Sequence, residues 1–115
     1  WLLPYTESRH IYLRKRPPKG IWGSLWTFLE DKSLGDIVNN NRDLKLLKES
    51  LVKHSSIKHS FSHYNLHAEL YLIKSESLAN TEHWKNISQF NNIGLPKPVL
   101  SVLNSILENE KNSIL

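Results

Sequence analysis

Residues 59–72 read His-Ser-Phe-Ser-His-Tyr-Asn-Leu-His-Ala-Glu-Leu-Tyr-Leu, and this stretch decides how the chain folds. Polar and apolar side chains alternate from residue 64 to residue 72, which is typical of a strand with one buried face. The face expected to point inward carries Tyr64, Leu66, Ala68, Leu70 and Leu72. The polar run at residues 59–63 predicts a turn between this strand and an earlier one over residues 52–60.

Shorter strands are expected on both sides of this pair. The sequence predicts them over residues 1–5, 10–15 and 83–87. Pro17 and Pro18 end the second of these strands, because two prolines fix φ and remove two hydrogen-bond donors. Residues 21–28 are aromatic-rich and predict a strand or loop, with Gly23 where two backbones approach closely.

Helices complete the pattern. They are expected over residues 33–38, over residues 43–51, where leucines recur at helical spacing, and from Pro96 onward. Ser33 is the expected N-cap of the first helix. The last helix carries one apolar side, made of Val99, Val102, Leu103, Ile106 and Leu107. This order of elements predicts an α+β fold with helices packed on a sheet.

The length and the termini bound the class of protein. The 115 residues suffice for one domain with a core and are too few for two, so residues 1–115 are expected to form a single domain. The chain begins without methionine, in what reads as the middle of a strand, so we expect a piece excised from a longer protein. It carries neither a signal peptide nor an apolar stretch of membrane-spanning length. We therefore expect no membrane partner.

Composition excludes some chemistry and favours one partner. The chain has no cysteine, which excludes disulfides, thiolate zinc sites and cysteine-ligated iron–sulfur clusters in this segment and is compatible with a cytoplasmic location. Its net charge of +4 attracts polyanions, nucleic acid first among them. The alternative is that such a charge only keeps the domain in solution.

Three kinds of catalytic or metal site are disfavoured by the spacing of the residues. His59, His63 and His67 are four apart, but four residues of a strand span about 13 Å, too far to share an ion. Ser62 and His63 are sequence neighbours, which point to opposite faces of a strand and do not form a nucleophile with its base. The carboxylates are scattered along the chain as on a solvated surface.

The turn at residues 59–63 is better suited to recognition. Its hydroxyl and imidazole groups can contact a base edge or a phosphate, with Lys58 nearby and Phe61 or Tyr64 able to stack. The alternative is an ordinary hairpin turn with Phe61 buried in the core.

Three motifs resemble the C-terminal domain of MutY, the family of adenine DNA glycosylases that act on adenine mispaired with 8-oxoguanine. Residues 16–28, Arg-Pro-Pro-Lys-Gly-Ile-Trp-Gly-Ser-Leu-Trp-Thr-Phe, resemble the family's tryptophan-rich segment. Residues 59–66 resemble its His-x-Phe-Ser-His motif, and residues 92–99 its closing Gly-Leu-Pro-x-Pro-Val segment. Together they cover nearly the whole chain in the family's order.

The resemblance implies a Nudix-like (MutT-like) fold, a mixed sheet with packed helices, and a role in recognising the lesion. It implies that Ser62 meets the altered O8/N7 edge of 8-oxoguanine, with Phe61 and His63 shaping the turn and Lys58, His59 and Tyr64 as further candidates. The expected partners are double-stranded DNA with A·8-oxoguanine or A·G mispairs and the enzyme's own N-terminal catalytic domain. That domain holds the excising residues and the iron–sulfur cluster, so this chain is expected to have no cofactor and no glycosylase activity alone. The expected location is the bacterial cytoplasm, at the nucleoid.

Two departures from related sequences bear on function. The Nudix hydrolase signature needs a magnesium-binding Arg-Glu-x-x-Glu-Glu helix, whereas residues 31–53 carry a lone Glu49 and no such cluster. Ser24 stands where the family has a second glycine, and Leu29 where it often has proline. Two other functions stay open: an active Nudix hydrolase on oxidised nucleotides, and a protein-interaction module built on a patch of Trp1, Trp22, Trp26 and Trp84.

Overall fold

Five strands form one mixed sheet at the centre of the described residues. The computed structural model describes residues 1–42, 44–60, 65–76 and 82–108. In this part of the chain the sheet order is β5-β6-β1-β2-β7, and β1 runs parallel to β6 while the other neighbours are antiparallel. The strands are β1 (Leu2–Tyr5), β2 (His10–Tyr12), β5 (Leu46–Ser60), β6 (Asn65–Ser75) and β7 (Trp84–Asn86). A second pair, β3 (Arg14–Lys15) with β4 (Trp26–Thr27), is antiparallel.

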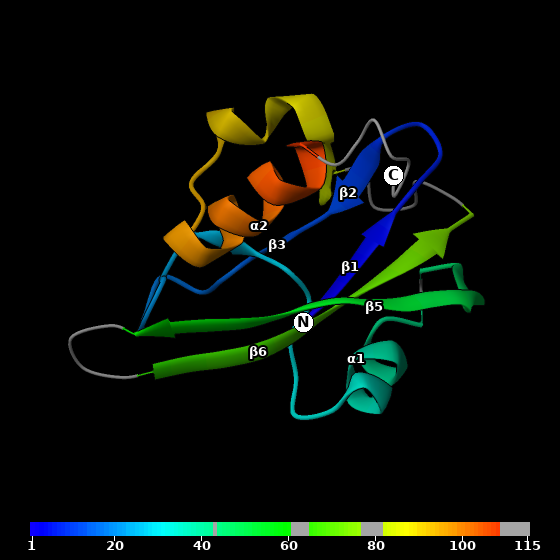
Figure 1. The fold of residues 1–115 in the computed structure, drawn as a ribbon, viewed down its shortest axis with the longest axis horizontal. Coiled ribbons are helices and arrows are strands. Elements are labelled where there is room, and N and C mark those ends of the chain that lie inside the picture. The colour runs from blue at the N-terminus through cyan, green and yellow to red at the C-terminus, as the bar shows by residue number, and fades with distance from the viewer. Residues whose placement is uncertain (43, 61–64, 77–81, 109–115) are drawn as a thin grey trace.

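Helices cover both faces of the sheet (Figure 1). One face packs on α2 (Lys97–Glu108) and the 3-10 helix η1 (Ile87–Asn92), and the other on α1 (Leu34–Asn40). Adjacent residues of one strand serve opposite cores, because side chains alternate across a strand. Leu72 thus belongs to the α2 core and Ile73 to the α1 core, and both are fully or almost fully buried.

The β5–β6 hairpin extends beyond its neighbours in the sheet. The pairing of β1 with β6 runs from Leu2↔Tyr71 to Tyr5↔Lys74, so the first half of β6 is paired along its length with β5 alone. Figure 1 shows the two long strands reaching out from the body of the fold. The predicted alternation holds along this strand: Leu66 and Ala68 are partly covered, Leu70 and Leu72 are fully buried, and Tyr64 lies outside the described residues.

The helix predicted over residues 43–51 is wrong. From Leu46 onward this segment belongs to β5, with Leu46 opposite Ser75. The register shifts between Leu47 and Val52, where the Ser50 hydroxyl donates to the Leu47 carbonyl (2.6 Å) and accepts from the Lys74 N–H (2.8 Å). Long-range pairing with β6 therefore outweighs the helical spacing of the leucines. The shift in register is a bulge-like irregularity of β5, in which this strand has more residues than the β6 segment opposite it.

Other predicted elements are confirmed or shortened. Ser33 caps α1 as predicted, with its hydroxyl accepting from the Asp36 N–H (3.1 Å). The strand expected over residues 10–15 breaks at Leu13, whose N–H donates to the His83 carbonyl (3.0 Å), so it contributes to two sheets. The strand around Trp84 and the last helix are present, and η1 between them was not expected.

The loop before β4 follows an unusual backbone path, in which Gly20, Trp22 and Ser24 all have positive φ. Gly23 lies where two backbones approach closely, as predicted: a Cβ there would come within 3.0 Å of the Lys19 nitrogen and 3.1 Å of the Pro18 carbonyl carbon. Ser24 (φ 63°) adopts the left-handed conformation that glycine prefers, so the loop keeps this geometry despite the substitution.

Candidate nucleic-acid interface

The arms of the hairpin present two different faces. Residues directly opposite in an antiparallel pair share a face, and Lys58 lies opposite His67 while His59 lies opposite Leu66. Lys58 and His67 are exposed, as are Ser60 and its partner Asn65. On the other face, His59 and Leu66 are half-buried. The exposed face therefore carries Lys58, Ser60, Asn65 and His67 near the last described residues of both arms, and Glu69 opposite Ser56 farther from that end.

The predicted site residues are only partly within view. Phe61, Ser62, His63 and Tyr64 lie outside the described residues. Lys58 and His59 lie on opposite faces of β5, so the structure does not bring these two candidates together. It pairs Lys58 with His67 instead, which was not predicted as a site residue, because the match depends on the hairpin register rather than on local sequence.

A groove between β5 and α2 opens beside the same arm. It has a volume of about 330 Å³. We call it the β5–α2 groove, and its lining comprises His54, Ser55, Ser56, Ile57, Lys58, His59, Pro98, Ser101, Val102 and Ser105. None of these ten residues is acidic. Ser101 and Ser105 also went unpredicted, because only the packing of α2 against the sheet places them near β5.

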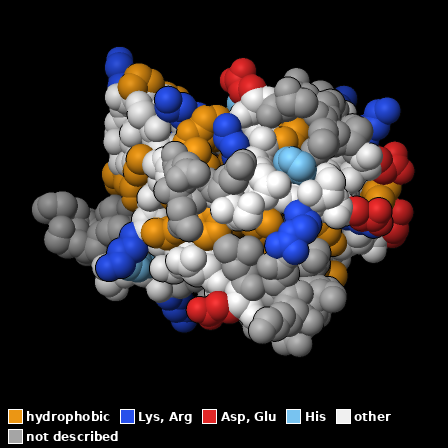
Figure 2. Space-filling model, turned by 90° about the horizontal axis from the view of Figure 1, so that it is seen from above, with side chains coloured by type: hydrophobic (Ala, Val, Ile, Leu, Met, Phe, Trp, Pro, Cys, Tyr) orange, Lys and Arg blue, Asp and Glu red, His pale blue; other side chains and the backbone are white. Residues whose placement is uncertain are grey.

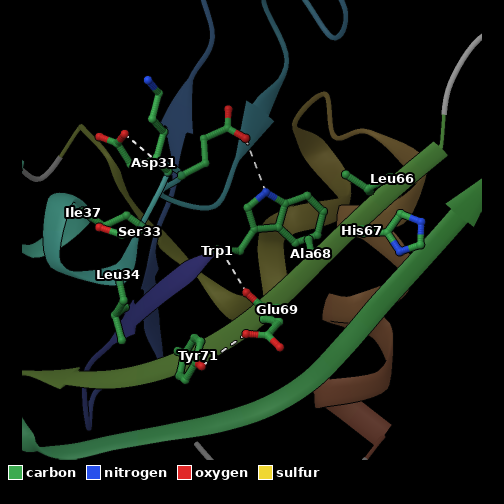
Figure 3. Close-up of a pocket in the computed structure, with 12 residues that line it drawn as sticks. Trp1, Asp31, Ser33, Leu34, Ile37, Leu66, His67, Ala68, Glu69 and Tyr71 are labelled. Carbon is green, nitrogen blue, oxygen red and sulfur yellow. Dashed lines mark hydrogen bonds between the residues drawn. The ribbon is translucent and has the colours of Figure 1, made fainter.

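A larger hollow lies on the β6 side of the hairpin. We call it the Trp1 pocket; it has a volume of about 440 Å³ and contains three carboxylates, Glu30, Asp31 and Glu69. The Trp1 indole N–H donates to Glu30 (3.3 Å), and the Trp1 amino group donates to the Glu69 carbonyl (2.8 Å), as Figure 3 shows. Most of its polar groups are therefore bonded to one another.

Charge is distributed unevenly around these features. The Glu69 carboxylate accepts from Lys53 Nζ (3.1 Å), and this hydrogen bond, with the charge of the lysine, lowers the pKa of Glu69. Arg16 pairs with Glu30. Seen from above, cationic side chains are scattered among hydrophobic ones, while the largest acidic group lies at the right, opposite to the end where the hairpin projects (Figure 2).

Two open alternatives can be compared with this geometry. Within the described residues no group of three His, Asp or Glu side chains is placed to hold a metal ion. Of the four tryptophans, Trp84 is buried and the other three are half-buried, with Trp1 and Trp26 packed against the α2 core. Among the side chains that the structure describes, the exposed large hydrophobic ones are instead Ile21 and Val52. Among the described helices, none has both the length and the hydropathy needed to cross a bilayer.

The mixed sheet between α1 and α2 defines the class of fold. The structure is similar to that of a Nudix hydrolase from M. smegmatis, RenU, with a TM-score of 0.62 over 99% of this chain and 84% of the other, at 15% identity. Residues 1–105 match the NUDIX domain family, and the chain belongs to that family. The predicted α+β, Nudix-like fold is confirmed.

Sequence comparison identifies more specific relatives. The chain is 24% identical over 115 residues to the adenine DNA glycosylase of Buchnera aphidicola subsp. Acyrthosiphon pisum, and 28% identical over 113 residues to that of Buchnera aphidicola subsp. Baizongia pistaciae. These alignments cover 95% and 92% of this chain but 33% and 32% of the relatives. The predicted resemblance to a single domain of these glycosylases is thus confirmed, and the chain spans about a third of their length.

Proposed function

We propose that this chain is the DNA-binding, lesion-recognition domain of an adenine DNA glycosylase, acting on adenine paired with 8-oxoguanine or guanine. The observation that carries the proposal is the hairpin whose arms flank the Phe-Ser-His motif in the sequence. β5 ends at Ser60 and β6 begins at Asn65, both arms project from the sheet, and Lys58 and His67 are exposed on one face near these ends. The sequence similarity to adenine DNA glycosylases supports the same role.

The chemistry of the motif fits the lesion. Guanine has a hydrogen-bond acceptor at N7, whereas 8-oxoguanine has a donor there, so a hydroxyl that accepts at this position distinguishes the two bases. We assign this contact to Ser62, with Phe61 and His63 shaping the turn and His59 and Tyr64 as supporting residues. One well-placed hydrogen bond to a base edge gives about 1–3 kcal/mol of discrimination.

The proposal also sets the context of the chain. It works beside a catalytic domain that excises adenine and carries the iron–sulfur cluster, in the bacterial cytoplasm at the nucleoid. The chain alone then needs no cofactor and has no glycosylase activity. It binds one side of the duplex while the adenine is flipped into the other domain.

The test is an NMR titration of the 115-residue chain at low salt with duplexes that differ only in carrying A·8-oxoguanine or A·G. We expect amide shifts centred on residues 58–64 and larger for the lesion duplex. Ser62→Ala should abolish the difference between the duplexes, while Ser56→Ala, which removes another exposed serine hydroxyl of the same arm, should preserve it. Equal and diffuse shifts for both duplexes with the unmodified chain would refute the proposal.

A further inference from the structure

The β5–α2 groove has the donor set of an anion site. Serines line both of its walls, Ser55 on β5 and Ser101 and Ser105 on α2, while Ser56, also in the lining, lies opposite Glu69 and belongs to the other face of β5. Imidazole groups are present as well, and the His54 ring nitrogen lies 3.1 Å from the Ser55 hydroxyl. Since no lining residue is acidic, an anion in this groove meets donors and no like charge.

The shape of the groove is set by one side of α2 and by an open strand edge. Pro98, Ser101, Val102 and Ser105 follow one another at helical spacing, so two apolar and two hydroxyl side chains line the same side. Ser101 and Ser105 are exposed, while Val102 is buried and forms part of the floor. Opposite them, β5 is the terminal strand of the five-stranded sheet, so along its outer side main-chain N–H and C=O groups are not paired with another strand of that sheet.

We propose that the β5–α2 groove binds the sugar–phosphate backbone of the DNA that the hairpin contacts. The proposal rests on the proposed function, because the groove follows β5 as far as His59, the first residue of the motif at residues 59–63. Phosphate oxygens accept hydrogen bonds from hydroxyl and N–H donors of this kind, and such contacts fix the register of a protein on a duplex without reading its sequence. The apolar floor accommodates the sugar.

The other large hollow on the hairpin is a poor match for the same ligand. The Trp1 pocket exceeds the groove in volume but carries three carboxylates, which repel a phosphate. A second possible occupant of the groove is an extended protein segment added to the open edge of β5. Such a segment gains its affinity from main-chain hydrogen bonds, whereas the groove residues offer an anion hydroxyl and imidazole groups and no acidic side chain.

The test places a negative charge in the groove and, as a matched control, at an exposed position of the same helix outside the lining. Ser105→Glu adds a carboxylate to the lining, and Asn104→Glu adds one at an exposed position that is not part of it. Affinity for fluorescent duplexes with A·8-oxoguanine or A·G is measured by anisotropy across a salt series. Ser105→Glu should weaken binding to both duplexes about fivefold to tenfold at low salt, and Asn104→Glu by less than about twofold.

The two readouts separate this inference from the function on which it rests. A ratio of affinities for the two duplexes that stays above one in Ser105→Glu, with both affinities reduced, supports the backbone contact. If Ser105→Glu binds DNA as tightly as Asn104→Glu while the unmodified chain still prefers the lesion, the groove is not on the DNA path and the inference fails alone. If the unmodified chain binds both duplexes equally, the lesion role fails, and the difference between the two variants still decides the groove. If the unmodified chain binds neither duplex, both proposals fail. Thermal melts followed by circular dichroism check that both variants are folded.

Discussion

The Trp1 pocket and the β5–α2 groove flank the same pair of strands, and they differ in the charge of the side chains that line them. In the pocket, Glu30 accepts from Trp1 and pairs with Arg16, while Glu69 accepts from Lys53. In the groove, hydroxyls and imidazoles line a hollow without any acidic side chain. The Trp1 pocket is thus acidic, and its carboxylates already accept hydrogen bonds, whereas the groove has no acidic side chain and is suited to an anion.

The largest effect on stability is expected when the indole of Trp1, which lines the Trp1 pocket, is removed. Trp1 packs edge-on against Phe28 (5.2 Å between ring centroids) and contacts Trp22 (6.3 Å). Because it is half-buried, Trp1→Ala should lower the free energy of unfolding by about 2–3 kcal/mol, less than a fully buried tryptophan. Urea unfolding measures this loss. If the pocket is structural, affinity for DNA well below the melting temperature should stay within about twofold of the unmodified chain. A large loss of DNA affinity without a loss of stability would move the interface to the pocket.

The loop that places Trp22 against the Trp1 ring gives the next largest effect. In Gly23→Ala the new methyl group would lie 3.0–3.3 Å from backbone atoms of Pro17, Pro18 and Lys19, which cannot move aside as a side chain would. We expect a destabilisation of about 1–3 kcal/mol by urea unfolding. Gly35→Ala is the control, because its Cβ meets only the Ser33 hydroxyl, at 3.9 Å. Equal stabilities of the two variants would show that the loop is not tightly packed.

Two lysines on the same face of β5 should differ in how they serve DNA binding. Lys58 lies opposite His67 and is exposed near the end of the hairpin, while Lys53 lies opposite Tyr71 and is engaged by Glu69. Lys58→Gln should weaken DNA binding by about 1 kcal/mol and reduce the slope of log affinity against log salt by about one. Lys53→Gln should change the slope less, although it leaves the Glu69 carboxylate without this lysine. Anisotropy titrations across a salt series measure both slopes. Equal slopes for the two variants would show that the ion pair with Glu69 does not set Lys53 apart from Lys58.

Much of this architecture follows from local sequence, and the parts that do not follow have a common cause. The alternation before Leu72, the Ser33 cap and the apolar side of the last helix are local signals, and each produced the expected element. The segment from Leu46 to Leu51 has a helical spacing of leucines, but it pairs with the far end of β6, which is distant along the chain. The groove could not be predicted from the sequence for the same reason. Ser105 and His54 are far apart along the chain, and only the packing of α2 on the sheet brings them to one groove. The motif at residues 61–64 was found by resemblance to a family, and its geometry lies outside the described residues.

Replacing Ser24, the residue after Gly23, by glycine should have a smaller effect and should stabilise the fold. Ser24 holds φ at 63°, which costs a residue with a Cβ about 1 kcal/mol or more relative to glycine. Ser24→Gly should therefore raise the free energy of unfolding by up to about 1 kcal/mol, after the greater flexibility of glycine in the unfolded chain is subtracted. Paired urea unfolding curves with Ser101→Gly, a substitution within α2 that should destabilise, give the comparison. A loss of stability in Ser24→Gly would mean that the serine side chain contributes more than its backbone strain removes.

The smallest effect concerns the Glu69 carboxylate, one of the three acidic groups that line the Trp1 pocket. The Lys53 hydrogen bond and charge lower the pKa of Glu69, so the folded state favours the ionised carboxylate. The stabilisation is present above the ordinary pKa of a glutamate and is lost as the pH falls toward the lowered value. Lys53→Gln should raise the pKa of Glu69 back toward its ordinary value, which an NMR titration of the side-chain carboxyl carbon detects. Because Glu69 is exposed and screened by solvent, the stability of the fold at neutral pH should hardly change. Glu7, whose pKa is lowered in the same way by Lys74, serves as the internal reference and should not shift. A Glu69 titration that is the same with and without Lys53 would show that the pair contributes no field at the pocket, and the acidic character of that side would then rest on Glu30 and Asp31.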